Sequence, residues 1–296
     1  MIEEIIIYGT IAGAVYALLA LGFTLIYGVA GVVNLAHGSF FMIGAYIFGI
    51  FGPKGFMSYL DLNPFLSLLV AAVTVSIIGI IIYRIAIHPV IEDEVATLVV
   101  TVSLAIILQQ LMLLIFGPEF LPLPSFATGG TTILGVLVTY SRLIAFSASI
   151  VLFVILWILI SKTKIGSAMR AVSQDREVAM LMGINTTGLY MLTMGLSAAL
   201  AALAGIFITG SGTGVASSFM WLHPLALSFS IVILGGLGSV KGTTVGGFII
   251  GYAETIVSIT LPEAGIIVPT VPFALMVIIL VLRPKGLFGK RVELEE

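Results

Sequence analysis

Long runs of hydrophobic residues alternate with short polar or glycine-containing interruptions along the whole chain. A membrane-spanning helix needs about 20 mainly apolar residues, and windows of that length recur throughout. The pattern predicts an all-α polytopic membrane protein with about 8–10 transmembrane helices, because two of the segments could be re-entrant hairpins instead of full spans. The predicted spans are residues 5–28, 32–52, 64–83, 95–116, 143–161, 186–209, 225–239, 243–260 and 266–282.

Composition agrees with this pattern. Of the 296 residues, 60% are hydrophobic and only 9% are charged, whereas soluble domains carry about 25% charged residues. No interval between the apolar segments is long enough for a separate soluble domain, so we expect residues 1–296 to form one membrane domain. The acidic start, MIEEIIIYGT, lacks the basic region of a cleaved signal, which predicts that the first span is retained.

The distribution of Lys and Arg predicts the orientation. If the N-terminus lies outside, ten of the 12 basic residues face the cytoplasm, and the positive-inside rule then favours an external N-terminus and a cytoplasmic C-terminus. That parity requires an odd number of crossings. The ten residues are Arg84, Lys162, Lys164, Arg170, Arg176, Lys241, Arg283, Lys285, Lys290 and Arg291, and the two expected outside are Lys54 and Arg142.

Two glycine-rich stretches resemble each other and indicate an internal repeat. Aligned with an offset of 207, Ile26–Gly44 and Ile233–Gly251 share seven identical positions in 19. Paired, glycine-interrupted hydrophobic segments in two parts of a chain are a pointer to the substrate path of a transporter. Unwound backbone survives in a membrane only where protein or a water-filled cavity satisfies its polar groups.

The first of these stretches contains NLAHGSF, an unusually polar sequence for a membrane span. Asn34 and His37 lie three residues apart and would share one face of a helix. They are candidates for the translocation pathway or its gate, together with Gly31, Gly38 and Gly238. The alternative is a polar clamp between packed helices, since Asn and His also form interhelical hydrogen bonds.

Glu254 is the only acidic residue well inside a predicted span. Burying a carboxylate there is costly unless it is paired or neutralised, so it is a further candidate pathway residue, with a structural hydrogen bond as the alternative. For Gln109 and Gln110 we expect interhelical hydrogen bonding. Three glycine pairs have the small-xxx-small spacing of closely packed helices. They are Gly9/Gly13, Gly242/Gly246 and Gly247/Gly251.

The segment from residue 162 to residue 188 is a polar interruption with net positive charge. Apolar residues recur in it at helical spacing, which predicts a short helix. Gly183 reads as the residue that ends this helix, and Asn185 or Thr186 as the N-cap of the next span. Such a helix could lie on the membrane surface or dock on a partner protein.

Three ordered motifs carry a resemblance that runs over nearly the full chain. They are YALLALGFTLIYGVAGVVNLAHGSFFMIGAY (residues 16–46), RAVSQDREVAMLMGIN (residues 170–185) and GGLGSVKGTTVGGFIIGYAE (residues 235–254). Together they resemble the LivH-type permease of branched-chain amino acid ABC importers. NLAHGSF and the short N-terminus favour this subunit over its LivM-type partner.

The resemblance implies a multi-pass permease of a prokaryotic cytoplasmic (inner) membrane, embedded in lipid and without a nucleic-acid partner. Its implied partners are a second, LivM-type permease, two cytoplasmic ATPases and an extracytoplasmic substrate-binding protein. Residues 170–185 would correspond to the loop that engages an ATPase. The implied coupling residues are Arg170, Asp175, Arg176, Glu177, Ala179 and Gly183.

Enzyme chemistry and nucleotide binding find no support in the motifs. GGLGSVKGTT lacks the glycine that a phosphate-binding loop requires before its lysine, so ATP would be used by partner subunits and no cofactor is expected in this chain. GSGTG (residues 210–214) reads as an external connector. The chain has no cysteine and no His-Glu-x-x-His pair, so no metal site is expected.

The resemblance leaves the cargo open, because related permeases carry urea, amides or other amino acids. The alternative function is an autonomous channel or proton-coupled carrier for a small polar solute.

Overall fold

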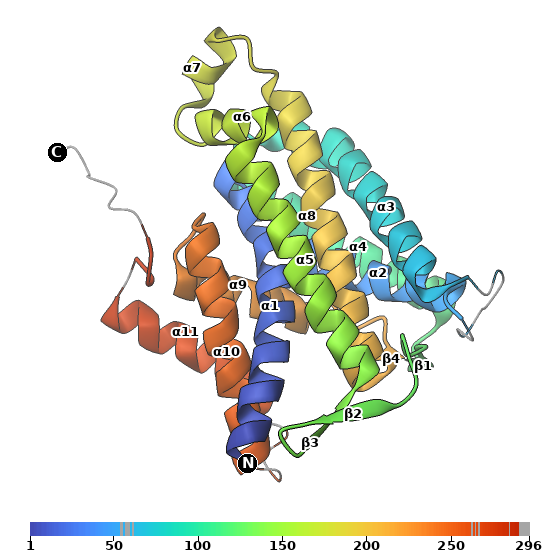
Figure 1. Ribbon diagram of the computed structural model, residues 1–296. Helices are drawn as coiled ribbons and strands as arrows, with labels where there is room; N and C mark the ends of the chain where they lie inside the picture. Colours follow the sequence, from blue (N-terminus) through green and yellow to red (C-terminus); the bar gives the residue numbers. More distant parts are fainter. Residues whose placement is uncertain are drawn as a thin grey trace.

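The computed structural model describes residues 1–53, 56, 60, 62–261, 263, 265, 267–283 and 285–289, and this part of the chain is a helical bundle (Figure 1). Lys54, Lys290 and Arg291, three of the basic residues used to predict orientation, lie outside it. The helices are α1 (Ile2–Ala30), α2 (His37–Phe51), α3 (Pro64–Ile82), α4 (Glu94–Phe116), α5 (Tyr140–Lys162), α6 (Lys164–Val172), α7 (Arg176–Leu181), α8 (Thr186–Ile208), α9 (Leu222–Gly235), α10 (Val240–Thr260) and α11 (Val271–Leu282).

Each of the nine predicted spans contains a helix of this bundle, which confirms the all-α polytopic class. Within the described residues, six helices are long and apolar enough to cross a membrane, and three apolar helices are shorter. The shorter ones are α2, α9 and the segment containing α11. With 15 residues, α2 extends only about 22 Å, less than the roughly 30 Å of a bilayer core.

The two short helices α2 and α9 begin beside each other in the interior. Gly38, in the first turn of α2, packs against the carbonyl group of Trp221, which caps the start of α9. Further along α2, the hydroxyl of Tyr46 forms a hydrogen bond with the hydroxyl of Ser218 (3.0 Å), in the segment that precedes α9. The indole of Trp221 donates to Gln109 of α4, so Gln109 makes the interhelical bond that the sequence predicted.

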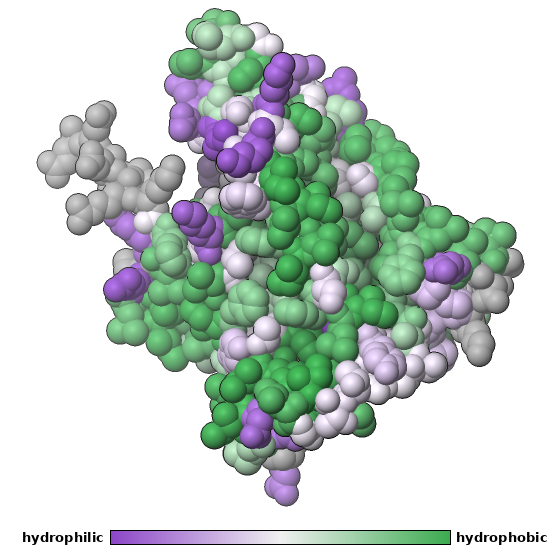
Figure 2. All heavy atoms as spheres, viewed as in Figure 1, coloured by the Kyte–Doolittle hydropathy of each residue, from purple (hydrophilic) through white to green (hydrophobic). Residues whose placement is uncertain are grey.

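Helix α8 lies at the centre of the bundle, in contact with α1, α2 and α3. The interior is therefore built mainly from α1, α2, α8 and α9, whereas α3, α4 and α5 present many apolar side chains outward. Figure 2 shows the resulting hydrophobic surface, with hydrophilic residues gathered around α6 and α7. Apolar residues on both the inside and the outside are the expected arrangement for helices surrounded by lipid.

One end of the bundle carries two small antiparallel sheets that the sequence analysis did not predict. Strand β1 (Leu121–Pro122) pairs with β4 (Val215–Ala216), and β2 (Gly130–Ile133) pairs with β3 (Val136–Thr139). The β2–β3 turn has positive φ at both Leu134 (49°) and Gly135 (81°), the requirement of a type I′ hairpin. We call this the hairpin end; the N-terminus lies there (Figure 1).

The opposite end carries α6 and α7 (Figure 1), and we call it the loop end. Arg176 of α7 pairs with Glu92, which precedes α4 (3.5 Å). The chain after α11 also reaches this end, because Leu287 donates to the carbonyl of Leu234 (2.9 Å), near the last residue of α9. The N-terminus and residues 286–289 therefore lie at opposite ends, as an odd number of crossings requires.

Small residues hold α1 against α10. A Cβ on Gly251 would lie 2.5 Å from the Cα of Gly13, and one on Gly247 would lie 2.6 Å from the Cα of Ala17. Gly246 packs in the same way against the carbonyl of Ile231 in α9. The predicted packing role of the small-xxx-small pairs is therefore found in the structure.

The two stretches proposed as a repeat match structurally at their turns. Gly31 and Gly238, equivalent in the alignment, follow α1 and α9 and have positive φ of 69° and 77°. The turns also touch, since a Cβ on Gly28 would lie 3.6 Å from the Cα of Gly238. The flanking helices differ in length, because α1 has 29 residues and α9 has 14.

The segment GSGTG was predicted as an external connector, and this is wrong for its first residues. Residues 209–213 continue α8 as a π-helical turn, which ends at Gly214 with φ 68°. The backbone N–H of Gly214 bonds to the carbonyl of Thr209 (2.7 Å). Glycine content suggested a loop, but helical backbone hydrogen bonding continues through these residues as far as Gly214.

Candidate functional site: two cavities along helix α1

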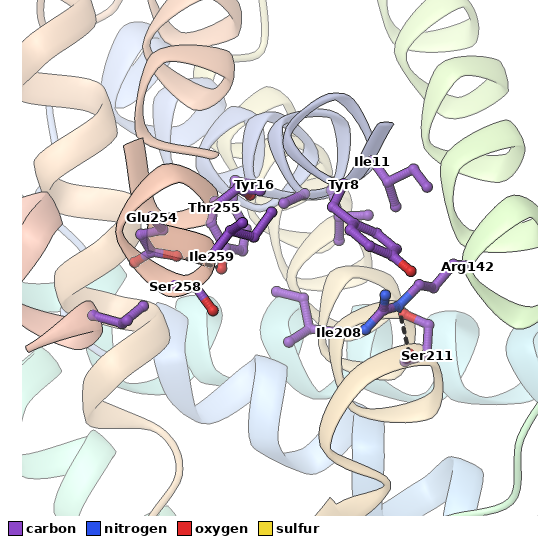
Figure 3. Close-up of a pocket in the computed structure, with 13 residues that line it drawn as sticks. Tyr8, Ile11, Tyr16, Arg142, Ile208, Ser211, Glu254, Thr255, Ser258 and Ile259 are labelled. Carbon is purple, nitrogen blue, oxygen red and sulfur yellow. Dashed lines mark hydrogen bonds between the residues drawn. The ribbon is translucent and has the colours of Figure 1, made fainter. Parts of the chain in front are cut away.

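A cavity of about 430 Å³ opens between α1, α5, α10 and the end of α8, near the hairpin end. Its lining is mainly apolar, with Ile11, Val15, Ile208 and Ile259 among its walls. Figure 3 shows Glu254, Thr255 and Ser258 on one side of it and Tyr8, Arg142 and Ser211 on the other. We call it the hairpin-end cavity. A mainly apolar space of this size with a few polar groups is typical of a small-molecule site.

Glu254 lies on α10 at the inner side of this cavity and is only 5% exposed. Its Oε2 accepts a hydrogen bond from the hydroxyl of Tyr16 on α1 (2.6 Å). Its Oε1 is buried and has no hydrogen-bond partner among the described residues. The carboxyl group is therefore half satisfied, an arrangement that is costly in a low-dielectric interior.

Arg142, in the first turn of α5, lines the same cavity. Its guanidinium lies 4.6 Å from the ring centroid of Tyr8, in cation–π contact. Its Nε donates a long hydrogen bond to the carbonyl of Ser211 (3.4 Å). Tyr8 is in turn anchored by its hydroxyl, which donates to the carbonyl of Leu137 in the hairpin (2.7 Å). The cation is thus held at the hairpin end of the cavity.

A second cavity, of about 550 Å³, opens at the loop end. Its walls include the helix-breaking glycines Gly31 and Gly238, together with Tyr27 and Ser239. Val172, Ser173 and Arg176 of the α6–α7 region form another wall. We call it the loop-end cavity. Two predicted site glycines and one predicted coupling residue therefore meet around one space.

Between the two cavities α1 is closed off from solvent. Every residue from Ala17 to Ile26 is buried, a length of about 15 Å at 1.5 Å per residue. Tyr16, Phe23 and Ala30 share one face of α1 because they are spaced by seven residues. Tyr16 lines the hairpin-end cavity and Ala30 the loop-end cavity, so Phe23 lies between them.

Phe23 is covered by two aromatic side chains from the short helices. Its ring packs edge-on against His37 of α2 (centroids 5.6 Å apart) and against Phe229 of α9 (6.0 Å). The imidazole also reaches the carbonyl of Leu19 (Nε2 to O 3.0 Å) and Ser197 of α8 (Nδ1 to Oγ 3.4 Å). Phe23, which lies on the face of α1 between the two cavities, is therefore held by contacts from α2 and α9.

Asn34, His37 and Gly38 line neither cavity. The Oδ1 atom of Asn34 accepts the backbone N–H of Ala36 (3.1 Å), and its Nδ2 contacts Met194 of α8 (3.6 Å). Asn34 and His37 are both fully buried. These are the contacts of the polar clamp, one of the two alternatives that the sequence left open, and a pathway role for these residues stays a prediction.

The loop between α5 and α8 forms two short helices, where one was predicted. Asp175 divides the loop into two helices because it is the N-cap of α7. Its Oδ1 accepts a hydrogen bond from the backbone N–H of Val178 (2.9 Å). Gly183 adopts φ 83° and Ile184 donates back to the carbonyl of Ala179 (3.1 Å), which closes α7. Asn185 caps α8 by accepting from Gly188 (2.9 Å). The predicted roles of Gly183 and Asn185 are confirmed.

The predicted coupling residues differ in exposure, and most of them face solvent. Ala179 is buried, and Arg170 ties α6 to the end of α5 by donating to the carbonyl of Ile160. Arg176 faces Tyr190 of α8 (5.9 Å to the ring centroid). Glu177 and four apolar neighbours point to solvent. The neighbours are Val178 (53% exposed), Met180 (44%), Leu181 (86%) and Met182 (78%).

Sequence reasoning missed Tyr8, Tyr16 and Arg142 as site residues. The two tyrosines lie in an otherwise apolar span, and a tyrosine in a span usually needs a partner for its hydroxyl, which was a usable signal. Arg142 was noted only for orientation. The described part of the chain contains no group of three or more His, Cys, Asp or Glu side chains that could hold a metal ion.

Comparison with known proteins relates this architecture to transport. Residues 5–280 match the family model described as branched-chain amino acid transport system / permease component. The chain is 30% identical over 294 residues to the high-affinity branched-chain amino acid transport system permease protein BraD of Pseudomonas aeruginosa, covering 96% of this chain and 95% of that protein. It is 32% identical over 294 residues to the permease protein LivH of Escherichia coli (strain K12), covering 95% and 94%.

A solved structure shares the fold. PsaBC from Streptococcus pneumoniae in complex with Fab superposes with a TM-score of 0.55 at 15% sequence identity, covering 96% of this chain and 97% of that chain. Fold similarity at this identity carries no information on cargo. The family match over most of the chain does carry identity: this protein belongs to the family of permease components of branched-chain amino acid transport systems.

Proposed function

We propose that this chain is the transmembrane permease subunit of an ATP-driven ABC importer for branched-chain or related amino acids, and that it forms part of the translocation pathway. BraD and LivH are permease proteins of high-affinity branched-chain amino acid transport systems, which supports this cargo class. ATP would be used by partner subunits. The loop end would face the cytoplasm and the N-terminus the outside of a prokaryotic inner membrane.

One observation carries the proposal: the α6–α7 region is itself a wall of the loop-end cavity. Val172, Ser173 and Arg176 line that cavity together with the helix break at Gly31 and Gly238. A force applied to α7 therefore reaches the cavity directly. This is the connection that an importer needs between an ATPase and its pathway, because coupling requires an element whose position both sites bias.

The tip of α7 would be the ATPase dock. Val178, Met180, Leu181 and Met182 expose apolar side chains, and Figure 2 shows this apolar tip rimmed by hydrophilic residues. A contiguous apolar patch with a polar rim marks a protein interaction site. Glu177 would contribute to the rim, while Ala179 and the caps at Asp175 and Gly183 hold the shape.

Movement of the dock would be passed to two spans. Arg176 links α7 to Glu92 before α4 and to Tyr190 on α8. Shifts of these helices would have to displace Phe23, which lies on the face of α1 between the cavities and packs against His37 and Phe229. Alternating access then opens the hairpin-end cavity and the loop-end cavity in turn, with a second, LivM-type permease supplying the rest of the pathway.

The test is uptake of labelled leucine into vesicles containing this chain with its candidate permease, ATPase and binding-protein partners, with and without ATP. Uptake only in the complete, ATP-supplied set is the expected result. Omitting each partner in turn serves as the control for its contribution. Uptake by this chain alone, driven by a proton gradient, would overturn the proposal in favour of an autonomous carrier.

A second arm tests the dock. Leu181→Ser and Met182→Ser remove exposed apolar side chains without touching the buried Ala179. We expect each to weaken ATPase association by about tenfold, the effect of losing about 1.4 kcal/mol at an interface hot spot. Phe219→Ser, which alters an exposed side chain near the hairpin end, is the matched control. Equal association of all three variants would place the dock elsewhere.

A further inference from the structure

The carboxyl group of Glu254 lies at the wall of the hairpin-end cavity, and one of its two oxygens has no hydrogen-bond partner among the described residues. Oε2 is fixed by the hydroxyl of Tyr16 (2.6 Å), whereas Oε1 is buried without a partner among the described residues. The side chain is 5% exposed, and Figure 3 shows it among the residues that line the cavity. A buried carboxylate normally finds a cationic or hydrogen-bonding partner. A missing partner at a cavity wall indicates that a ligand supplies it.

Arg142 is too distant to be that partner. It packs on Tyr8, while Glu254 bonds to Tyr16. These tyrosines are eight residues apart on one helix, which separates them by about 12 Å along its axis. An ion pair needs its nitrogen and oxygen within about 4 Å. The described residues show no ion pair to Glu254, so a cation that completes it would come from outside this part of the chain.

The rest of the cavity narrows the chemistry of that cation. Ile11, Val15, Ile208 and Ile259 provide apolar walls beside the carboxyl group. A hydrated metal ion would be poorly served by such walls, and the described residues offer no cluster of carboxylates around Glu254. A primary ammonium group on an aliphatic body matches both features, because its N–H groups bond the free oxygen and its carbon chain contacts the isoleucines.

We propose that Glu254, positioned by Tyr16, binds the primary ammonium group of a small aliphatic amine or amino acid in the hairpin-end cavity. The assignment to a transported amino acid rests on the proposed function, while the ammonium chemistry does not. A second source of the same group is the headgroup of phosphatidylethanolamine. Arg142, at the other side of the cavity, would be free to meet the carboxylate of an amino acid as it enters.

Carbodiimide labelling tests the site without requiring transport. The complete complex is placed in vesicles of phosphatidylcholine and phosphatidylglycerol, which carry no primary ammonium group, and modification of Glu254 by dicyclohexylcarbodiimide is measured by peptide mass spectrometry. Isopentylamine and leucine should each reduce labelling about tenfold at ten times their dissociation constants. 4-Methylpentanoate, which has the same carbon chain and no amine, should leave labelling unchanged. Glu119, which is exposed, serves as the internal reference carboxyl group.

The outcomes separate the possible sources. Protection by leucine and isopentylamine supports a site for the cargo. Protection that appears only in vesicles containing phosphatidylethanolamine supports the ammonium site and assigns it to lipid. Equal protection by 4-methylpentanoate or by sodium ions, or protection by none of the amines, overturns the proposal. A complex that shows protection without ATP-driven uptake would refute the proposed function and leave the ammonium site standing.

Two variants check that Tyr16 acts through Glu254. Tyr16→Phe keeps the ring and removes the hydrogen bond, so leucine should protect Glu254 less well, by about tenfold for a hydrogen bond to a charged group worth about 1.5 kcal/mol. Tyr252→Phe is the matched control, because its hydroxyl bonds Thr10 (2.6 Å) on the same pair of helices. Equal loss in both variants would indicate a general effect on helix packing and would refute the positioning role.

Discussion

The two cavities along α1 differ in the kind of wall that encloses them. The hairpin-end cavity lies between long helices, and the seam beside it is packed so closely that a Cβ on Gly251 would lie 2.5 Å from the Cα of Gly13. The loop-end cavity is walled by chain breaks at Gly31 and Gly238 and by the short α6–α7 helices. Close packing suits the recognition of a ligand, whereas chain breaks suit movement.

The charged groups follow the same division. Glu254 faces the hairpin-end cavity and accepts a hydrogen bond from Tyr16 with one of its two oxygens, whereas Arg176 faces the loop-end cavity and forms an ion pair with Glu92. We infer that the buried carboxyl group is available to a ligand, whereas the guanidinium at the loop end connects α7 to the segment before α4. Four substitutions test this difference between the two cavities.

The largest effect is expected at the loop end, from Gly183→Pro. Gly183 has φ 83° and donates to the carbonyl of Met180 (2.9 Å), whereas proline fixes φ near −65° and has no N–H, at a cost of about 3 kcal/mol or more. ATP-driven uptake should fall to the vesicle background while the complex still binds cargo at the hairpin end. Gly183→Asn, which tolerates a left-handed conformation, should retain uptake. Parental uptake by the proline variant would contradict a coupling role for this loop.

Joining the two cavities should have the next largest effect. Phe23→Ala removes the ring that lies between His37 and Phe229. We expect an ATP-independent leak of labelled leucine from preloaded vesicles, several times faster than in the parent complex. Phe48→Ala is the matched control, since Phe48 is equally buried but packs against Phe126 away from α1's central segment. If both variants leak equally, the leak reflects a cavity in the core and Phe23 is not a barrier.

A smaller effect should follow from opening the seam beside the hairpin-end cavity. In Gly251→Ala the new methyl group would meet the backbone of Gly13, which cannot move aside, so the variant should lose about 1–3 kcal/mol of stability. Its thermal unfolding in detergent should begin several degrees lower. Gly265→Ala is the control, because a Cβ there has no neighbour within 4 Å. Unchanged unfolding of the Gly251 variant would show that this wall is not rigid.

The smallest effect is expected from Arg142→Gln. An ion pair between Arg142 and the carboxylate of an entering amino acid, in a cavity open to solvent, is worth up to about 1 kcal/mol, which corresponds to a change of up to about fivefold. Leucine should require a higher concentration for half-maximal protection of Glu254 or half-maximal uptake, with the maximal ATP-driven rate retained. Arg176→Gln, at the loop end, should instead lower the maximal rate. The reverse pattern would mean that the two cavities have exchanged roles.

Local signals in the sequence predicted much of the secondary structure. Apolar runs located all nine predicted helical segments, because a lipid-embedded helix must satisfy its own backbone hydrogen bonds within one continuous stretch. Gly183 and Asn185 were identified as helix boundaries because capping depends on a few neighbouring residues. The same local reasoning overlooked the N-cap at Asp175, which divides the loop into α6 and α7. It also overlooked the β2–β3 hairpin, although Leu134-Gly135 lies between alternating residues.

The candidate site was less accessible to sequence reasoning. Glu254, Gly31 and Gly238 were selected as unusual residues in apolar surroundings, and all three line a cavity. Asn34 and His37 were selected for the same reason, yet their contacts are those of a clamp. Polarity in a span signals that a partner is needed, and it does not say whether that partner is protein or ligand.

The amino-acid sequence was enough to identify a helical membrane protein of a permease family, to locate its nine apolar helical segments, and to single out the residues that are too polar for lipid. The tertiary structure was needed to show that Glu254 bonds to Tyr16 while Arg142 packs on Tyr8, about two turns away on the same helix. It was also needed to show that Phe23 packs against His37 and Phe229. The physical reason is the range of the interactions. Hydrogen bonding within a helix and capping act over a few residues, whereas a cavity is enclosed by helices that pack together from distant parts of the chain.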